Sequence, residues 1–330
     1  MARTRRVRVC AGGRVHFGFC NLSLGHERLY GGMGVALDAP RLELTVERAE
    51  EIECDDEAVR PYVERAVECL GVPGARVVAE SSLPRHAGLG SGTPVALSAL
   101  TGVGRAYDGD PNARELAPEL GRGGRSGVGV ATFESGGFVL DAGHPTARFT
   151  TARPARGEWR VPAVSARHEM PEEWRFLLVV PEAEAGRSDE ADDESKRAGV
   201  ERADPDIADR VAGVVTRRLL PAIAEGAVER FGAAVEEVGR LNGAWYADEQ
   251  GGVYRPPVGS VVAVLADDPA VFGAGQSSWG PTVYGVTDAE RAEAARAAGK
   301  RALDEADVDG RVRVVRGRND GAEVVDARND

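Results

Sequence analysis

The most constraining feature of the chain is a glycine-rich stretch, PRHAGLGSGT at residues 84–93, between a strand-like run at 75–81 and an apolar, alanine-rich segment at 94–106. A helix that opens on such a turn leaves several backbone N–H groups without intrahelical partners, and its dipole adds partial positive charge there. Glycines also let the main chain approach an anion without Cβ clashes. The stretch therefore predicts a phosphate site built from backbone. The alternative is a plain glycine-rich turn before a buried helix.

Neither of the two common nucleotide motifs matches this stretch. No lysine follows the glycines, as a P-loop requires, and the glycines stand too close together for the dinucleotide fingerprint. The hydroxyls of Ser91 and Thr93 add further donors. His86 is the one histidine inside the loop, and we expect it to contact a phosphate or to help deprotonate a substrate. The residues predicted to bind phosphate here are Gly88, Leu89, Gly90, Ser91, Gly92 and Thr93.

A second glycine-rich stretch, GRGGRSGVG, occupies residues 121–129. Arg122 and Arg125 suit bidentate binding of phosphate, with a mobile loop as the alternative interpretation. Glu134 and Asp141 follow this stretch and could reach Mg²⁺ bound to phosphates, or they could be ordinary carboxylates at a strand end.

A third stretch, GQSSWGP at residues 275–281, is either a second backbone-lined wall of the pocket or a tight turn. Its candidate binding residues are Gln276, Ser277 and Ser278. Trp279 and Pro281 beside them could shape a face that binds an aromatic ring.

Charge and composition exclude several classes of protein. The 330 residues carry a formal net charge of −12, and nearly all the cations are arginines, since Lys196 and Lys300 are the only lysines. The overall field therefore repels nucleic acid, and we expect no such partner. An acidic, lysine-poor surface is typical of a halophilic cytoplasm, although a GC-rich genome that encodes Arg in place of Lys is the alternative.

The expected location is cytoplasmic. The four cysteines are scattered singly, without metal-type spacing, as in a protein that keeps its thiols reduced. No apolar signal core follows the basic start of the chain, and no run approaches the length of a membrane span.

The order of expected elements indicates an α+β protein. In the first half we expect a hairpin of strands 6–10 and 15–19 around a turn at 11–13, strands at 41–48 and 75–81, helices at 57–70, 94–106 and 112–120 (capped by Asn112), and a turn into a strand at 133–141. Composition shifts at 146–167. In the second half we expect strands at 174–181, 282–286 and 311–315, a surface loop at 182–202, and helices at 206–220, 228–241, 258–271 and 288–302.

The loop at 84–93 resembles the phosphate loop of the GHMP kinase superfamily. Together with RVHFGF at 14–19, RLYGGMG at 28–34 and the stretches at 121–129 and 275–281, the match narrows to the family of β-ribofuranosylaminobenzene 5′-phosphate synthases. The resemblance covers nearly the whole chain and is weakest around 182–202.

This resemblance implies a two-domain α+β fold with the active site between the domains. Residues 1–155 would form a ribosomal-S5-like N-terminal domain with the phosphate loop, and residues 156–330 a ferredoxin-like C-terminal domain. The implied reaction condenses phosphoribosyl pyrophosphate with 4-aminobenzoate or 4-hydroxybenzoate and releases CO₂ and pyrophosphate, as in methanopterin biosynthesis. Mg²⁺ is the implied cofactor, and a homodimer is an option.

The resemblance also orders the candidate residues by role. The catalytic candidates are His86, Arg125 and Glu134. Ser126 and Arg122 are candidates for phosphate binding, and Arg14, Arg28 and residues 276–278 are candidates for substrate binding. Asp141 is the candidate metal ligand. The sugar and mevalonate kinases of the superfamily carry a catalytic Asp just after the Ser-Gly of the second glycine-rich stretch, where this chain has Gly129. This departure argues against an ATP-dependent small-molecule kinase, which stays as the alternative beside a non-catalytic binding protein.

Overall fold

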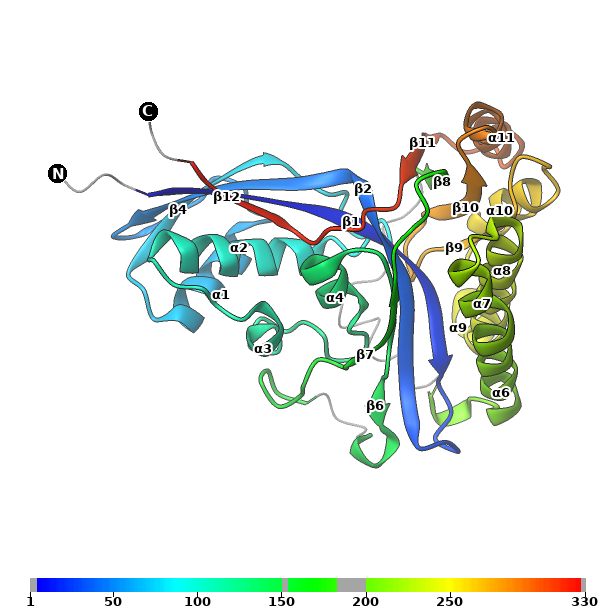
Figure 1. Cartoon of the computed structure of the whole chain (residues 1–330), viewed down its shortest axis with the longest axis horizontal. Helices are drawn as coiled ribbons and strands as arrows, with labels where there is room; N and C mark the ends of the chain where they lie inside the picture. The colour runs from blue at the N-terminus through cyan, green and yellow to red at the C-terminus, as the bar shows by residue number, and fades with distance from the viewer. Residues whose placement is uncertain (1–4, 150–153, 183–199, 328–330) are drawn as a thin grey trace.

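The computed structural model describes residues 5–149, 154–182 and 200–327. It contains two β-sheets whose strands are mostly antiparallel. The first sheet has eight strands with the path β12-β1-β2-β4-β3, and β5, β6 and β7 pair beside that path. Its strands are β1 (Arg6–Asn21), β2 (Arg28–Ala49), β3 (Ile52–Glu53), β4 (Gly74–Ser81), β5 (Phe138–Asp141), β6 (His144–Pro145), β7 (Val164–His168) and β12 (Glu323–Ala327). Figure 1 shows β1 and β2 as long strands that separate two groups of helices.

The predicted hairpin at the start of the chain is wrong. Residues 6–21 form one continuous strand, and Ala11 and Gly12 pair with Leu42 and Arg41 of β2. The register shifts between Gly12 and Arg14, so the glycines make a bulge in place of a turn. A Cβ at Gly12 would overlap the carbonyl of Leu37, which explains why a residue without a side chain stands there.

The helices of the first half are α1 (Arg60–Leu70), α2 (Gly92–Ala106), α3 (Ala113–Leu116) and α4 (Val128–Ser135), followed by the 3₁₀ turn η1 (Thr146–Arg148). The predicted helices before Gly71 and after the phosphate loop are confirmed. The predicted helix at 112–120 is helical only over 113–116, although Asn112 caps it by accepting a hydrogen bond from the amide of Glu115. The expected turn at 133–137 is partly wrong, because residues 133–135 end α4.

The second sheet has the order β11-β8-β10-β9 and consists of β8 (Trp174–Pro181), β9 (Gly273–Gln276), β10 (Val283–Asp288) and β11 (Gly310–Arg316). Its helices are α6 (Pro205–Val214), the π-helical turn η2 (Val215–Leu219), α7 (Leu220–Ala224), α8 (Val228–Trp245), α9 (Ala247–Gln250), α10 (Val258–Ala266) and α11 (Ala292–Glu305). The predicted strands at 174–181, 282–286 and 311–315 are confirmed within two residues at each end. Most of the predicted loop at 182–202 lies outside the described residues.

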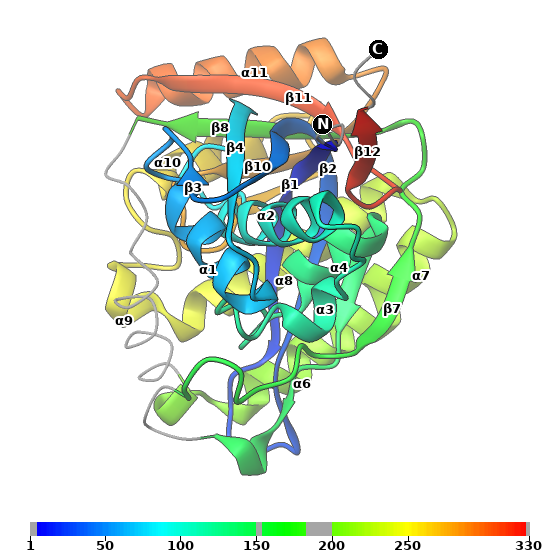
Figure 2. The same ribbon diagram turned by 90° about the vertical axis from the view of Figure 1, so that its left-hand side faces the viewer.

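Residues after position 155 contribute to both sheets. β7 pairs with β5, and β12 pairs with β1 in the register Arg6 to Ala327. The two ends of the chain therefore lie at the same end of the first sheet (Figures 1 and 2). The domain boundary between residues 155 and 156 stays a prediction. The pairing of β7 with β5 and of β12 with β1 shows that segments after this boundary complete the first sheet.

An aromatic cluster joins the two halves of the molecule. The ring of Phe231 on α8 lies 5.7 Å from Phe17 of β1, 6.1 Å from Phe138 of β5 and 4.9 Å from Trp174 of β8. Phe17 also meets Tyr284 of β10 at 5.1 Å. Because the rings come from both sheets and from α8, their burial holds the two sheets in one arrangement.

We expect Phe231→Ala to lower the free energy of unfolding by about 3–5 kcal/mol, because the change removes a fully buried ring and leaves a cavity between the sheets. Chemical denaturation measures this loss. Val78→Ala is the control, since Val78 is 46% exposed on β4 and should change stability by less than about 0.5 kcal/mol. Equal losses for the two variants would contradict a joining role for the ring.

Candidate functional site

The phosphate loop, residues 84–93, joins β4 to the N-terminus of α2. Gly88 and Gly90 have φ of +88° and +71°, in the left-handed region that favours glycine. Leu89 between them is 1% exposed and packs into the core that joins the sheets. This anchor and the two glycines shape the backbone that leads into α2, whose dipole adds partial positive charge at this end of the helix.

Two arginines flank the phosphate loop. Arg14 Nη1 donates to the carbonyl of Gly88 at 2.9 Å, and the Arg14 guanidinium packs against Gly90. Arg122 packs against Gly92, where a Cβ would lie 2.8 Å from its Nη1, and Arg122 Nη2 donates to the Tyr62 hydroxyl at 2.9 Å. Two guanidinium groups beside a helix N-terminus give the loop the positive potential that an anionic ligand requires.

The segment 275–281 forms the opposite wall of the loop. The Ser277 hydroxyl donates to the carbonyl of Gly88 at 2.8 Å and accepts from the amide of His16 at 3.1 Å. The amide of Thr282 donates to the carbonyl of Ala87 at 3.2 Å. Gly88 and Gly280 face each other so closely that a Cβ on either would overlap the other segment. The second sheet thus clamps the phosphate loop of the first half.

A buried chain of polar side chains supports the stretch 121–129. His16 Nε2 lies 3.2 Å from the hydroxyl of Ser126, which donates to Oδ2 of Asp141 at 3.2 Å. His16 and Asp141 are 4% and 2% exposed. The Asp141 carboxylate also accepts from the amides of Gly127 and Gly143, at 2.7 and 2.8 Å. This network holds the start of α4 against β1 and β5.

Burial raises the pKa of Asp141, and the backbone hydrogen bonds from Gly143 and Gly127 oppose that shift. Its oxygens are directed at these amides and at Ser126, so the carboxylate does not fit a metal ion. No group of three or more His, Cys, Asp or Glu side chains within the described ranges is arranged to hold one. The geometry therefore favours a positioning role for Asp141, and the metal assignment stays a prediction.

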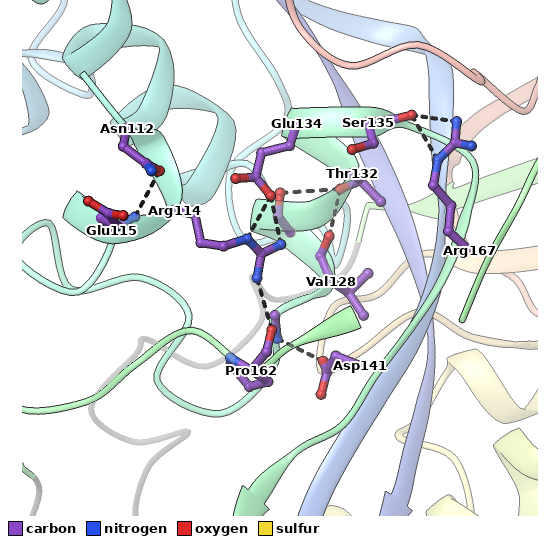
Figure 3. Close-up of polar contacts among 12 residues, drawn as sticks. Asn112, Arg114, Glu115, Val128, Thr132, Glu134, Ser135, Asp141, Pro162 and Arg167 are labelled. Atoms are coloured by element: carbon purple, nitrogen blue, oxygen red, sulfur yellow. Dashed lines mark hydrogen bonds and ion pairs between the residues drawn. The ribbon is translucent and has the colours of Figure 1, made fainter. Parts of the chain in front are cut away.

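Other candidates lie apart from the phosphate loop or have other partners. Glu134 stands at the far end of α4, where Arg114 donates to it through Nε and Nη2 at 2.9 and 2.6 Å (Figure 3). Arg28 donates to the carbonyls of Ala142 and Gly143. His86 is exposed on the loop with φ of +54°, and Arg125 is half-buried in the stretch 121–129. The oxygen of Gln276 accepts from the amide of Arg255, and its nitrogen donates to the carbonyl of Ser278.

Sequence reasoning missed two side chains that the fold brings to this site. The sequence predicted no role for His16. Tyr62 lies on α1, sixty residues before Arg122, and only the fold brings the two together. The one available signal for His16 was its place in RVHFGF, two residues after Arg14.

The fold and the glycine-rich anion site define a protein of the GHMP kinase class. The family model for the GHMP kinases N terminal domain matches residues 58–137. Among solved structures, mevalonate diphosphate decarboxylase from Staphylococcus aureus superposes with a TM-score of 0.66 at 12% identity, covering 98% of each chain. A homoserine kinase from Cytophaga hutchinsonii does so with a TM-score of 0.63 at 17% identity, covering 97% of each chain.

Sequence similarity to curated proteins identifies the family within this class. Beta-ribofuranosylphenol 5'-phosphate synthase of Methanothermobacter thermautotrophicus is 31% identical over 324 residues, 94% of this chain and 95% of the relative. The enzyme of the same name from Archaeoglobus fulgidus is 29% identical over 83% of this chain and 86% of its own length. The chain belongs to the beta-ribofuranosylphenol 5'-phosphate synthase family, as the resemblance of its motifs predicted. None of the helices within the described ranges is both long and apolar enough to span a membrane.

Replacing Ser277 by Ala should loosen the clamp on the phosphate loop. The change removes a fully buried hydroxyl and leaves the carbonyl of Gly88 and the amide of His16 each short of one partner, at a cost of about 1–3 kcal/mol. Thermal unfolding measures the loss. Ser278→Ala is the matched control, because Ser278 is exposed and its hydroxyl has no such role. The clamp is contradicted if both variants are as stable as the parent.

Gly32→Ala should disrupt the His16–Ser126–Asp141 network. Its Cβ would overlap the Ser126 hydroxyl and lie 2.9 Å from Oδ2 of Asp141, so we expect a loss of about 1–3 kcal/mol in unfolding free energy. Gly213→Ala on α6 meets only ordinary contacts and should stabilise the protein by about 0.5–1 kcal/mol through helix propensity. A neutral Gly32→Ala variant would show that the network tolerates an added methyl group.

Proposed function

We propose that the protein condenses phosphoribosyl pyrophosphate with 4-hydroxybenzoate, releasing CO₂ and pyrophosphate and leaving a ribosyl phenol 5′-phosphate. The observation that carries this proposal is an anion site flanked by two arginines, in a chain similar over nearly its whole length to synthases named for a ribofuranosylphenol phosphate. The name of those relatives favours 4-hydroxybenzoate over 4-aminobenzoate, since loss of its carboxylate leaves a phenol.

The phosphate loop and its arginines bind the pyrophosphate group in this proposal. The positive end of the α2 dipole, with Arg14 and Arg122, faces the negative charge that grows as the bond from ribose C1 to the pyrophosphate oxygen breaks. Arg125 and Ser126 belong to the neighbouring stretch and are proposed to extend this contact. His86 stays a candidate for contact with a phosphate oxygen. The pairing of Glu134 with Arg114 supports a structural role in place of a catalytic one.

The chemistry needs no covalent bond between enzyme and substrate and no net proton transfer. The ring carbon that bears the carboxylate forms a bond to ribose C1, and the pyrophosphate leaves with the electron pair of the broken C–O bond. The bond from the ring to the carboxylate then breaks, CO₂ leaves, and its electron pair restores the aromatic ring. Holding the two reactants in line supplies much of the acceleration of such a step.

We propose Mg²⁺ as a cofactor, but the described residues do not support a site in which the protein itself holds the ion. Their carboxylates form no cage for it, and Asp141 is committed to backbone amides. In this proposal, Mg²⁺ enters with the pyrophosphate oxygens of the substrate, as it does at many phosphate sites.

The kinase alternative lacks its catalytic residue, and the position that would carry it is tightly packed. Gly129 stands where the superfamily kinases carry their Asp, and a Cβ there would already lie 3.2 Å from Oγ1 of Thr93. A larger side chain at 129 would push against the first turn of α2. This contact supports the synthase over the kinase.

We further propose that the enzyme works in a salt-rich cytoplasm and that it is a homodimer. The acidic, lysine-poor composition supports the first point. Activity that rises with potassium chloride, and the mass of the particle in light scattering, test the two points separately.

Mass spectrometry of the purified protein tests the proposed function. With Mg²⁺, phosphoribosyl pyrophosphate and 4-hydroxybenzoate, we expect a decarboxylated ribosyl phenol phosphate and CO₂ in equal amounts, and a lower yield with 4-aminobenzoate. Arg122→Ala should weaken binding of phosphoribosyl pyrophosphate about tenfold or more, because it removes a charged partner from the anion site. Arg175→Ala on β8, whose guanidinium binds nearby carbonyls, is the control. ADP formation from ATP and an alcohol, without the phenol product, would favour the kinase.

A further inference from the structure

A pocket beside the phosphate loop has no role in the proposal so far. It encloses about 490 Å³, including its open mouth, between β1, α8 and the segment 275–281. Its wall includes the aromatic side chains of Phe19, Tyr246, Tyr254 and Trp279.

The pocket and the anion site share a wall. Gln276, Ser278 and Trp279 line the pocket, while Ser277 between them bonds to the carbonyl of Gly88 in the phosphate loop. His16 also lines the pocket, and its amide bonds to the same Ser277 hydroxyl. The same segment therefore lines the pocket and holds the phosphate loop, so that the two sites adjoin each other.

The lining suits a flat, uncharged ring. Within the described part of the chain, no Asp, Glu, Lys or Arg lines the pocket. Tyr246 and Trp279 meet edge to face with their centroids 4.7 Å apart, and their side chains are held by burial. Aromatic walls of this kind bind an aromatic ligand by stacked and edge contacts.

Two polar groups offer hydrogen bonds to such a ligand. Among the described residues, neither the hydroxyl of Tyr254 nor Oε1 of Gln250 has a hydrogen-bond partner, while the Nε2 of Gln250 donates to the carbonyl of Val253 at 2.8 Å. Burial raises the pKa of Tyr254 to about 12, so its hydroxyl stays protonated at neutral pH. A phenolic hydroxyl can donate to Gln250 and accept from Tyr254.

We infer that this pocket binds the ring of the benzoate acceptor, with the 4-hydroxyl directed toward Tyr254 and Gln250 and the carboxylate-bearing carbon toward the phosphate loop. The inference rests on the proposed function for the identity of the acceptor. The orientation follows from the chemistry, because the carbon opposite the 4-hydroxyl must reach ribose C1. The absence of a cation on the wall is consistent with a carboxylate that lies outside the pocket.

Filling the mouth of the pocket tests the inference. Val253 lines it and is 37% exposed, and Val324 on β12 is equally exposed and far from it in the fold. We expect Val253→Trp to weaken binding of 4-hydroxybenzoate about tenfold or more, because the indole occupies ligand volume, and Val324→Trp to leave it unchanged. Isothermal titration calorimetry with 4-hydroxybenzoate, alone and with saturating pyrophosphate, measures both. Binding of phosphoribosyl pyrophosphate should be the same in both variants.

A second variant covers the case in which Val253→Trp does not fold. Tyr254→Phe keeps the ring and removes the hydroxyl, so we expect the Kd for 4-hydroxybenzoate to rise about three- to tenfold and that for benzoate to stay the same. Unchanged 4-hydroxybenzoate binding in both variants, or no binding to the parent protein under either condition, overturns the inference.

Failure of the proposed function gives a different result. If the parent protein forms no phenol product, yet 4-hydroxybenzoate binds and Val253→Trp abolishes that binding, the pocket assignment stands and the reaction is wrong. If the product forms and Val253→Trp has the same KM for 4-hydroxybenzoate as the parent, the reaction stands and the pocket assignment is wrong.

Discussion

The carbonyl of Gly88 is the point on which the site depends. It accepts hydrogen bonds from Arg14 on β1 and from Ser277 beside β9, so it ties the phosphate loop to both sheets. A glycine is required at this position, because its φ is positive and a Cβ would overlap the carbonyl of Ser277. The loop thus keeps its shape through contacts with parts of the chain that are 74 and 189 residues away.

The arrangement explains why a kinase-like fold can serve a different reaction. The amides of a helix N-terminus and two arginines stabilise any phosphate-rich leaving group, whichever bond is broken. The reaction that follows depends on which group lies opposite the helix N-terminus and the arginines. Here the position that would carry an acidic side chain is Gly129, in tight contact with Thr93, and the neighbouring pocket has aromatic walls. Both features fit a carbon nucleophile that is an aromatic ring better than an alcohol that must be deprotonated.

Local patterns predicted much of this correctly. The end of α1 at Gly71 and the cap at Asn112 follow from short-range rules on glycine and on capping residues. The same rules failed at residues 11–13, where the glycines mark a bulge. A turn and a bulge have the same local composition, and only pairing with β2 decides between them.

The sequence by itself determined the phosphate loop, the helix behind it and the family, because these depend on residues next to one another in the chain. Tertiary structure alone decided that Arg122 stacks on Tyr62, that Asp141 is committed to the amides of Gly127 and Gly143, and that Glu134 pairs with Arg114. In each of these contacts, no pattern in the sequence relates the two partners to each other. Their partners are set by how the sheets and helices pack, and packing is a property of the whole fold.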